Sequence, residues 1–265
     1  MLISIKELVM KLVKLLLIPT VALFASSLVM AQEEESEASS VFPVDLKVCS
    51  YKDGKGPADL DQWFEKFNAW AGFDPTPDGY SAWTLTPFYY GPEQDFDFIL
   101  LGTSPNSAAL GLGHDAWVYS TEMSPEFYTI ATCEAFLNFA TLNIKKPWDD
   151  DDSESVVSFS DCEIAEGKTF DDVSPALQAW SAYRTGHGSK AGMWVMWQAY
   201  GGGDADFDFK FAGSHPDYAS WGVDYDQYAK EGYAKAEELF GEMLDCDVSR
   251  VYNARQQRDG ISDEE

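Results

Sequence analysis

Two aspartates occupy matching places in a segment that the sequence contains twice. The residues "DFDFILLG" end at Gly102, and the residues "DFDFKFAG" end at Gly213. Alternate residues of a β-strand share one face, so Asp97 and Asp208 point away from the phenylalanines beside them. We expect that face to look into a space between two sheets, where burial raises the pKa of a carboxyl group. One of the two could then act as a general base, unless the sheet is open there or Lys210 simply pairs with them.

Large aromatic residues stand on the segments that precede these carboxylates. The sequence has 9 Trp, 13 Tyr and 17 Phe, and most residues of this kind fill protein cores. A space lined by a few of them and by charged groups would still suit a small apolar, aromatic or cationic molecule. The expected ligand-binding residues are Trp83, Tyr89, Trp194, Tyr200 and Lys210.

Metal and cofactor chemistry have little support in the sequence. The three histidines, His114, His187 and His215, include no pair at metal-ligand spacing. The residues "DADFDF" resemble the start of a calcium loop but lack its glycine and its final glutamate. One histidine could be the axial ligand of a haem, although nothing selects which. We therefore expect no bound metal and no cofactor.

The four cysteines indicate that the chain is built from two similar halves. Cys133 follows Cys49 at the same distance as Cys246 follows Cys162, and glycines, prolines and aromatic residues match between the halves. Agreement over such a length predicts a tandem duplication. The expected domains are repeat 1 over residues 46–145, an acidic linker over 146–156, repeat 2 over 157–255 and a flexible tail over 256–265.

Each half predicts the order strand, helix, strand, strand, helix, strand. The residues "DLDQWFEKFNAW" place Leu60, Trp63 and Phe67 on one helical face. The second helix is clearest in "DYDQYAKEGYAKAEELFGEML", and Pro125 is expected to break its counterpart in the first half. This order is that of the ferredoxin-like βαββαβ unit, so the predicted fold class is α+β.

The cysteines stand where the outer strands of such a unit meet. The first and last strands of the unit are antiparallel neighbours, and each half has one cysteine near the end of its first strand and one at the start of its last strand. In an exported protein these pairs oxidise. We therefore expect the disulfides Cys49–Cys133 and Cys162–Cys246.

Two ferredoxin-like units in one chain resemble the dimeric α/β-barrel superfamily. The resemblance is one of architecture and covers nearly all of the chain after its first 45 residues. It implies that the two sheets face each other as a pseudo-twofold barrel. Members of the superfamily include cofactor-free monooxygenases, haem enzymes and stress-related binding proteins, so the fold alone does not decide the function. The chain could also belong to an uncharacterised exported bacterial family of this build.

The beginning of the chain reads as an export signal. Lysines precede the apolar run "LLLIPTVALFASSLV", and cleavage is expected between Ala31 and Gln32, which makes residues 1–31 a signal peptide. Residues 32–45 are expected to be an acidic disordered segment. The net charge of −27 disfavours nucleic acid and anionic membranes as partners. We expect a periplasmic or secreted monomer that has no membrane contact after cleavage.

These observations leave three functional hypotheses. The first is an exported protein that binds a small apolar or aromatic molecule between its two sheets. The second is a cofactor-independent monooxygenase or isomerase with Asp97 or Asp208 as its base. The third is a non-catalytic envelope interaction protein. A barrel interior packed with side chains would count against the first two.

Overall fold

The computed structural model describes residues 41–71, 79–92, 94–148, 153–203 and 205–260. All of them belong to one compact unit. The expected signal peptide, most of the expected acidic segment and the last five residues lie outside the described residues. Among the residues that are described, no helix is long and apolar enough to cross a membrane.

The described residues form two successive sets of strands and helices. The first set comprises β1 (Phe42–Tyr51), α2 (Pro57–Ala71), β2 (Ser81–Tyr89), β3 (Phe98–Thr103), α3 (Ser107–Tyr119), α4 (Met123–Ile130) and β4 (Ala131–Lys145). The second comprises β5 (Glu154–Ile164), α5 (Phe170–Gly186), β6 (Gly192–Tyr200), β7 (Phe209–His215), α6 (Tyr218–Gln227), the π-helix η1 (Tyr228–Gly232), α7 (Tyr233–Phe240), β8 (Leu244–Cys246) and β9 (Arg250–Arg258).

Three strand boundaries differ from those expected. β1 begins at Phe42, inside the segment that was expected to be disordered, and β5 begins at Glu154, inside the expected linker. β9 continues to Arg258, into the expected tail. The helical stretch of the first half is broken, but at Ser120 rather than at Pro125. Pro125 lies in the first turn of α4, where a helix tolerates proline.

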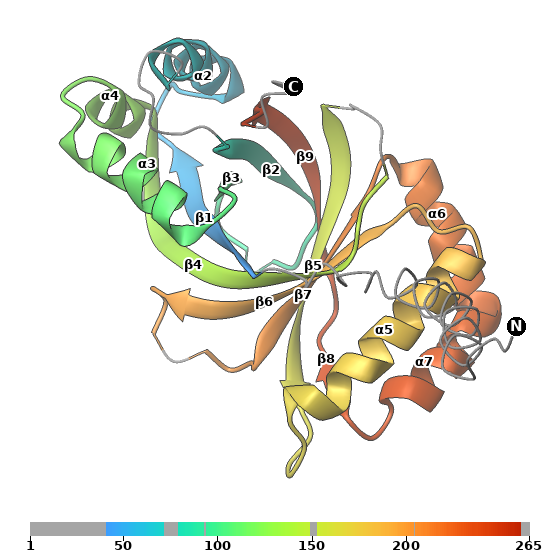
Figure 1. Cartoon of the computed structure of the whole chain (residues 1–265). Coiled ribbons are helices and arrows are strands. Elements are labelled where there is room, and N and C mark those ends of the chain that lie inside the picture. Colours follow the sequence, from blue (N-terminus) through green and yellow to red (C-terminus); the bar gives the residue numbers. More distant parts are fainter. Residues whose placement is uncertain (1–40, 72–78, 93, 149–152, 204, 261–265) are drawn as a thin grey trace, which may run out of the picture. The chain divides into compact units, whose positions relative to one another are not determined.

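The strands close into an eight-stranded antiparallel barrel (Figure 1). Their order is β7-β6-β4-β1-β3-β2-β9-β5, and the pairing of β7 with β5 closes the ring. Within the first half the order is β4-β1-β3-β2, and within the second it is β9-β5-β7-β6. The pairs β2–β9 and β4–β6 join the halves. β8 lies beside β5 as a short additional strand.

The inside of the barrel is filled by side chains. Along β1, Val44, Leu46 and Val48 point inward, as alternation along a strand requires. They pack with residues of both halves, including Phe139 and Phe159, in one buried cluster. Apolar side chains of both sheets therefore meet in the region where a ligand was expected.

The helices cover the outer face of the barrel in two groups (Figure 1). In the first half Trp63 of α2 and Phe127 of α4 pack on Phe98 of β3. In the second half Leu177 and Trp180 of α5 pack on Phe209 of β7. The phenylalanines within β3 and β7 thus lie under helices, as their alternation predicted. Phe96 and Phe207, which precede those strands, pack against the cluster inside the barrel instead.

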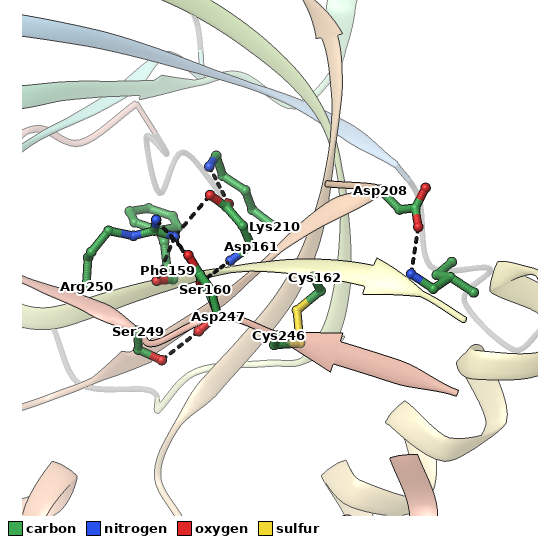
Figure 2. Close-up of a disulfide and its surroundings, with 11 residues drawn as sticks. Phe159, Ser160, Asp161, Cys162, Asp208, Lys210, Cys246, Asp247, Ser249 and Arg250 are labelled. Carbon is green, nitrogen blue, oxygen red and sulfur yellow. Dashed lines mark hydrogen bonds and ion pairs between the residues drawn. A yellow bond between two sulfur atoms is a disulfide. The ribbon is translucent and has the colours of Figure 1, made fainter. Parts of the chain in front are cut away.

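Both expected disulfides are confirmed. Cys49 of β1 lies opposite Cys133 of β4, and Cys162 of β5 lies opposite Cys246 of β8. Each bond joins residues that are 84 positions apart. Figure 2 shows the second bond, which joins β5 to β8. Each disulfide therefore links the first strand of its half to the segment at or just before the last strand of that half.

Lys47 on the outer face of β1 is an unusual buried amine. It is 9% exposed, and its Nζ lies over the rings of Trp117 (4.3 Å) and Phe136 (4.6 Å). Burial lowers the pKa of Lys47 from 10.5 to about 8, although the nearby charge of Asp45 opposes that shift. Below pH 8 the charged amine is therefore buried at a cost in stability.

Because the amine of Lys47 is buried, we expect the free energy of unfolding to rise with pH in the alkaline range. Between about pH 8 and pH 10.5 the folded amine has lost its proton while the unfolded one retains it. The unfolded chain then binds more protons, so stability rises with pH in this window. We expect the stability of the wild type relative to Lys47→Met to increase by up to about 3 kcal/mol across it. Urea unfolding of both proteins at pH 7.5, 9 and 10 measures this, and a constant difference would contradict it.

Candidate functional site

The aspartates expected to act as bases lie at the protein surface. Both precede their strands, β3 and β7, and both are exposed. The backbone N–H of Tyr51 donates to Asp97 Oδ2 (2.6 Å), and that of Ile164 donates to Asp208 Oδ2 (2.6 Å; Figure 2). The two carboxylates thus cap the ends of β1 and β5. The expectation that they are partly buried is wrong, because both precede their strands and are exposed, whereas their role as bases stays a prediction.

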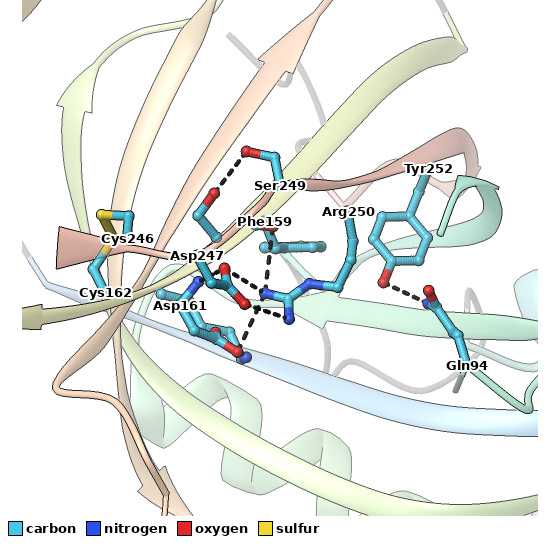
Figure 3. A network of polar contacts seen from close by, with 11 residues as sticks. Gln94, Phe159, Asp161, Cys162, Cys246, Asp247, Ser249, Arg250 and Tyr252 are labelled. Atoms are coloured by element: carbon cyan, nitrogen blue, oxygen red, sulfur yellow. Dashed lines mark hydrogen bonds and ion pairs between the residues drawn. A yellow bond between two sulfur atoms is a disulfide. The ribbon is translucent and has the colours of Figure 1, made fainter. Parts of the chain in front are cut away.

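Lys210 is held in an ion-pair network at one end of the barrel. Its Nζ lies 2.5 Å from Oδ1 of Asp161, the residue directly opposite on β5. Arg250 joins Asp161 (3.2 Å) to Asp247 (3.0 Å), as Figure 3 shows. Ser160 and Ser249 share a hydrogen bond beside this network. The charge of Lys210 is therefore matched by a carboxylate of the same barrel, and its role in ligand binding stays a prediction.

The four aromatic residues expected to bind a ligand separate into two pairs. Trp83 and Trp194 pack against the cluster that fills the barrel. Tyr89 and Tyr200 end their strands and are exposed. The ring of Tyr89 lies 6.0 Å from that of Trp221 on α6, whereas Tyr200 lines a cavity below α3. The two tyrosines therefore lie near cavities on the outer, helix-covered side of the sheet, each beside a helix of the opposite half.

A charged network in the second half is the first candidate site. Asp217 caps the start of α6 by accepting the backbone N–H of Ser220, which places Asp224 on the inner side of that helix. Asp224 Oδ2 accepts hydrogen bonds from Arg184 Nη2 (2.5 Å) and His215 Nε2 (2.8 Å). It also accepts one from the hydroxyl of Ser189 (2.6 Å). Donors from α5, from the loop after it and from β7 therefore converge on one carboxylate oxygen of α6.

This network fixes the protonation of its members. Burial opposes ionisation of Asp224, but the hydrogen bonds from His215 and Ser189 and the charge and hydrogen bond of Arg184 outweigh it and hold the pKa of Asp224 well below its usual range. An ionised carboxylate only accepts hydrogen bonds, so Nε2 of His215 carries a hydrogen. In the neutral form of this ring the lone pair is on Nδ1.

Two buried atoms of this network have no hydrogen-bond partner among the described residues. They are His215 Nδ1 and Arg184 Nε. His215 is 7% exposed, so water does not solvate its ring freely. Leaving a buried polar group unsatisfied costs about 1–3 kcal/mol. Such groups are few in native proteins, and a bound molecule that supplies the missing partner is one explanation for them.

The network forms part of the wall of a cavity of about 190 Å³, named here the His215 cavity. Its polar wall combines Arg184, Asp224 and His215 with the hydroxyls of Ser158, Ser160 and Ser249. Its apolar wall consists of Phe211, Trp221, Tyr225 and Tyr228. The rings of Trp221 and Tyr225 stack at 5.7 Å. The cavity therefore offers flat apolar surface next to hydrogen-bonding groups.

The sequence did not identify this network, because its members are not repeated. His215 and Asp224 correspond to Ser104 and Gly113 of the first half. Carboxylates that occur in both halves, such as Asp97 and Asp208, have the same structural role in each half. A site present in one half only is instead indicated by polar residues that stand where the other half has small ones, as His215 and Asp224 do.

Several solved structures share the fold of this chain. A candidate chlorite dismutase is similar over 83% of this chain and 96% of its own, with 12% identity and a TM-score of 0.51. A candidate monooxygenase from Fusobacterium nucleatum is similar over 83% and 94%, with 10% identity and a TM-score of 0.52. A mutant chlorite dismutase from Candidatus Nitrospira defluvii is similar over 82% and 92%, with 8% identity and a TM-score of 0.50.

Sequence comparisons add nothing to this likeness. No protein-family model matches the chain, and no curated protein matches it either. At such identities, the structural likeness shows the fold and leaves the reaction open. The chain has an α+β fold built on an eight-stranded antiparallel barrel, like that of the chlorite dismutase structures.

Proposed function

We propose that this chain is an exported protein that binds a small single-ring molecule in the His215 cavity. The observation that carries the proposal is the imidazole of His215, which lines the cavity, is held by Asp224 and has no partner at Nδ1 among the described residues. The proposal keeps the small-molecule ligand that the sequence suggested. It moves the ligand from between the sheets to the space between α6 and the outer face of the barrel.

The cavity indicates the class of ligand. Pockets for drug-sized ligands have volumes of about 300–1,000 Å³, so a cavity of 190 Å³ suits a smaller molecule. The rings of Trp221 and Tyr225 favour a flat apolar body. The guanidinium of Arg184 and the nearby serine hydroxyls favour a carboxylate or another hydrogen-bond acceptor. Benzoate is a simple molecule with both properties.

The residues of the His215 cavity do not fit a haem. Nε2 of His215 is engaged by Asp224 and is therefore not available as an axial ligand. The cavity is also smaller than pockets that hold much smaller organic molecules. The proposed function therefore involves no step through a haem.

A second candidate function is proton-transfer catalysis, as in a cofactor-independent monooxygenase. One observation favours it: the hydrogen on Nε2 leaves Nδ1 of His215 as a base oriented by a carboxylate. The likeness to the Fusobacterium protein agrees with it at the level of fold. Oxygen uptake with phenol as substrate, lost in His215→Gln, would support this candidate. Uptake no faster than that of the unfolded protein would exclude it.

The origin and location of the chain are part of the same proposal. We infer a tandem duplication of a ferredoxin-like unit, followed by divergence of the two helix-covered faces. The matching strand orders of the halves and the two equal disulfide loops support it. The disulfides also support export, because such bonds persist in oxidising compartments.

Closing the cavity tests the proposed function. Ser249 is exposed and lies three residues after Cys246, as Phe136 does after Cys133. We expect Ser249→Phe to fill the cavity wall without touching Asp224, and to weaken benzoate binding by at least about ten-fold in calorimetric titration. His187→Gln, an exposed change outside the cavity, should bind benzoate like the wild type. Equal affinity of Ser249→Phe and the wild type would reject this site.

A further inference from the structure

The first half has a cavity of its own, below α3. Its volume is about 380 Å³, within the range of about 300–1,000 Å³ that organic ligands occupy. Asp45, His114 and Asn138 form its polar wall. Its apolar wall comprises Pro43, Leu110, Phe136, Leu137 and the ring of Tyr200, which the second half contributes. We call it the His114 cavity.

A buried carboxylate forms the base of this cavity. Asp45 is 4% exposed and lies on the outer face of β1, directly opposite Asn138 of β4. Asn138 Nδ2 donates to Asp45 Oδ1 (2.8 Å), and His114 Nε2 donates to Asp45 Oδ2 (2.5 Å). Both carboxylate oxygens are therefore hydrogen-bonded, and neither needs a ligand.

His114 is the group that remains open to a ligand. Asn106 caps the start of α3, which places His114 two turns later over Asp45. As a carboxylate, Asp45 only accepts hydrogen bonds, so Nε2 of His114 carries the hydrogen and Nδ1 keeps its lone pair. The side chain of His114 is 41% exposed, in contrast to the buried ring of His215. A molecule in this cavity can reach Nδ1.

Two charged groups, Asp45 and Lys47, lie near His114. The ammonium of Lys47 lies behind Phe136, at 4.6 Å from its ring, and acts on Asp45 through their opposite charges. Asp45 in turn can stabilise the imidazolium that forms when His114 takes a proton. An oriented histidine with a buried carboxylate partner is the arrangement that general bases use.

We propose that the His114 cavity is a second small-molecule site, in which His114 accepts the hydroxyl proton of a small phenol-like molecule. The O–H bond of the molecule breaks, the N–H bond forms at Nδ1, and the electron pair stays on the oxygen. The aromatic body lies between Leu110, Phe136 and Tyr200. No oxidant or other reactant takes part.

This site is distinct from the one in the second half. In the first half the aspartate is on a strand and the histidine on a helix, whereas in the second half the histidine ends a strand and the aspartate is on a helix. The His215 cavity has an arginine and three serines in its wall, whereas the wall of the His114 cavity contains Ser107 and no arginine. The inference therefore does not depend on the proposed function.

The probe is 4-nitrophenol, because its ionised form absorbs visible light and its neutral form does not. 4-Nitrophenol is added at a pH below its own pKa, in separate titrations, to the full wild-type chain and to the full Ser249→Phe chain. We expect saturable binding with the absorption of the ionised form in both proteins. His114→Gln should remove that absorption and weaken binding by about ten-fold or more. His187→Gln, the matched change at an exposed histidine, should not alter the titration.

A second variant guards against loss of folding. Tyr200 is 76% exposed, so Tyr200→Ala leaves the core intact. It should weaken binding while the bound probe stays ionised. Circular dichroism confirms that each variant is folded. Absence of saturable binding, an unchanged absorption in His114→Gln, or a signal that disappears only in Ser249→Phe would each overturn the inference. The last of these results would place the probe in the His215 cavity.

Discussion

Removing the Cys49–Cys133 disulfide is expected to lower the free energy of unfolding by about 4.5 kcal/mol. The bond joins residues 84 positions apart, and closing so long a loop restricts the unfolded chain strongly. Alanine is the appropriate replacement, because Cys49 is fully buried and a serine hydroxyl would lack a partner. Urea unfolding of Cys49→Ala/Cys133→Ala, followed by circular dichroism, measures the loss.

The second disulfide provides an internal control. Cys162–Cys246 spans the same number of residues, so the chain-entropy model predicts the same loss for Cys162→Ala/Cys246→Ala. Similar losses in both variants would support an effect on the unfolded chain. A loss below about 1 kcal/mol in either would show that the bond contributes little to stability.

Asp224→Asn is expected to cost about 3–5 kcal/mol. The change leaves the guanidinium of Arg184, whose side chain is 14% exposed, without its counter-charge. It also replaces one acceptor oxygen of the carboxylate by an NH2 donor, which weakens the set of hydrogen bonds from Arg184, Ser189 and His215. Asp61→Asn is the matched control, since it breaks an ion pair with Arg255 at the surface. Exposed pairs contribute about 0–1 kcal/mol, so equal losses in the two variants would contradict the account of a buried network.

The difference in stability between the wild type and Asp224→Asn is expected to change with pH in a definite direction. The folded pKa of Asp224 lies below the unfolded one, so its stabilising effect is complete above the usual aspartate pKa of about 3.9. The effect decreases as the pH falls toward the folded pKa. The wild type should therefore exceed Asp224→Asn by less at pH 3 than at pH 5. Urea unfolding at these values tests this.

Much of the scaffold could be predicted from spacing and alternation. The equal intervals between cysteines predicted both disulfides, and alternation placed Phe98 and Phe209 under helices. These features depend on local geometry, which a sequence pattern carries directly. Strand boundaries were less certain, because β1 and β5 begin in acidic or polar segments that resemble linkers.

The candidate sites could not be predicted in the same way. Asp97 and Asp208 were expected to share a face with strand residues, but the strands begin one residue later. The packing inside the barrel depends on how side chains from the two sheets fit together. The alternation of residues within one sheet does not show this. His215 and Asp224 meet only because α6 folds over the end of β7. Such contacts between distant elements leave no periodic signal.

Histidine-selective NMR tests the central claim most directly, because the chain has only three histidines. The claim is that small molecules bind on the helix-covered faces and not inside the barrel. Chains labelled with ¹⁵N-histidine would be titrated with benzoate and, separately, with 4-nitrophenol. We expect benzoate to shift the ring signals of His215, 4-nitrophenol to shift those of His114, and neither to shift those of His187. Saturable binding of benzoate that leaves the ring of His215 unshifted would contradict the account.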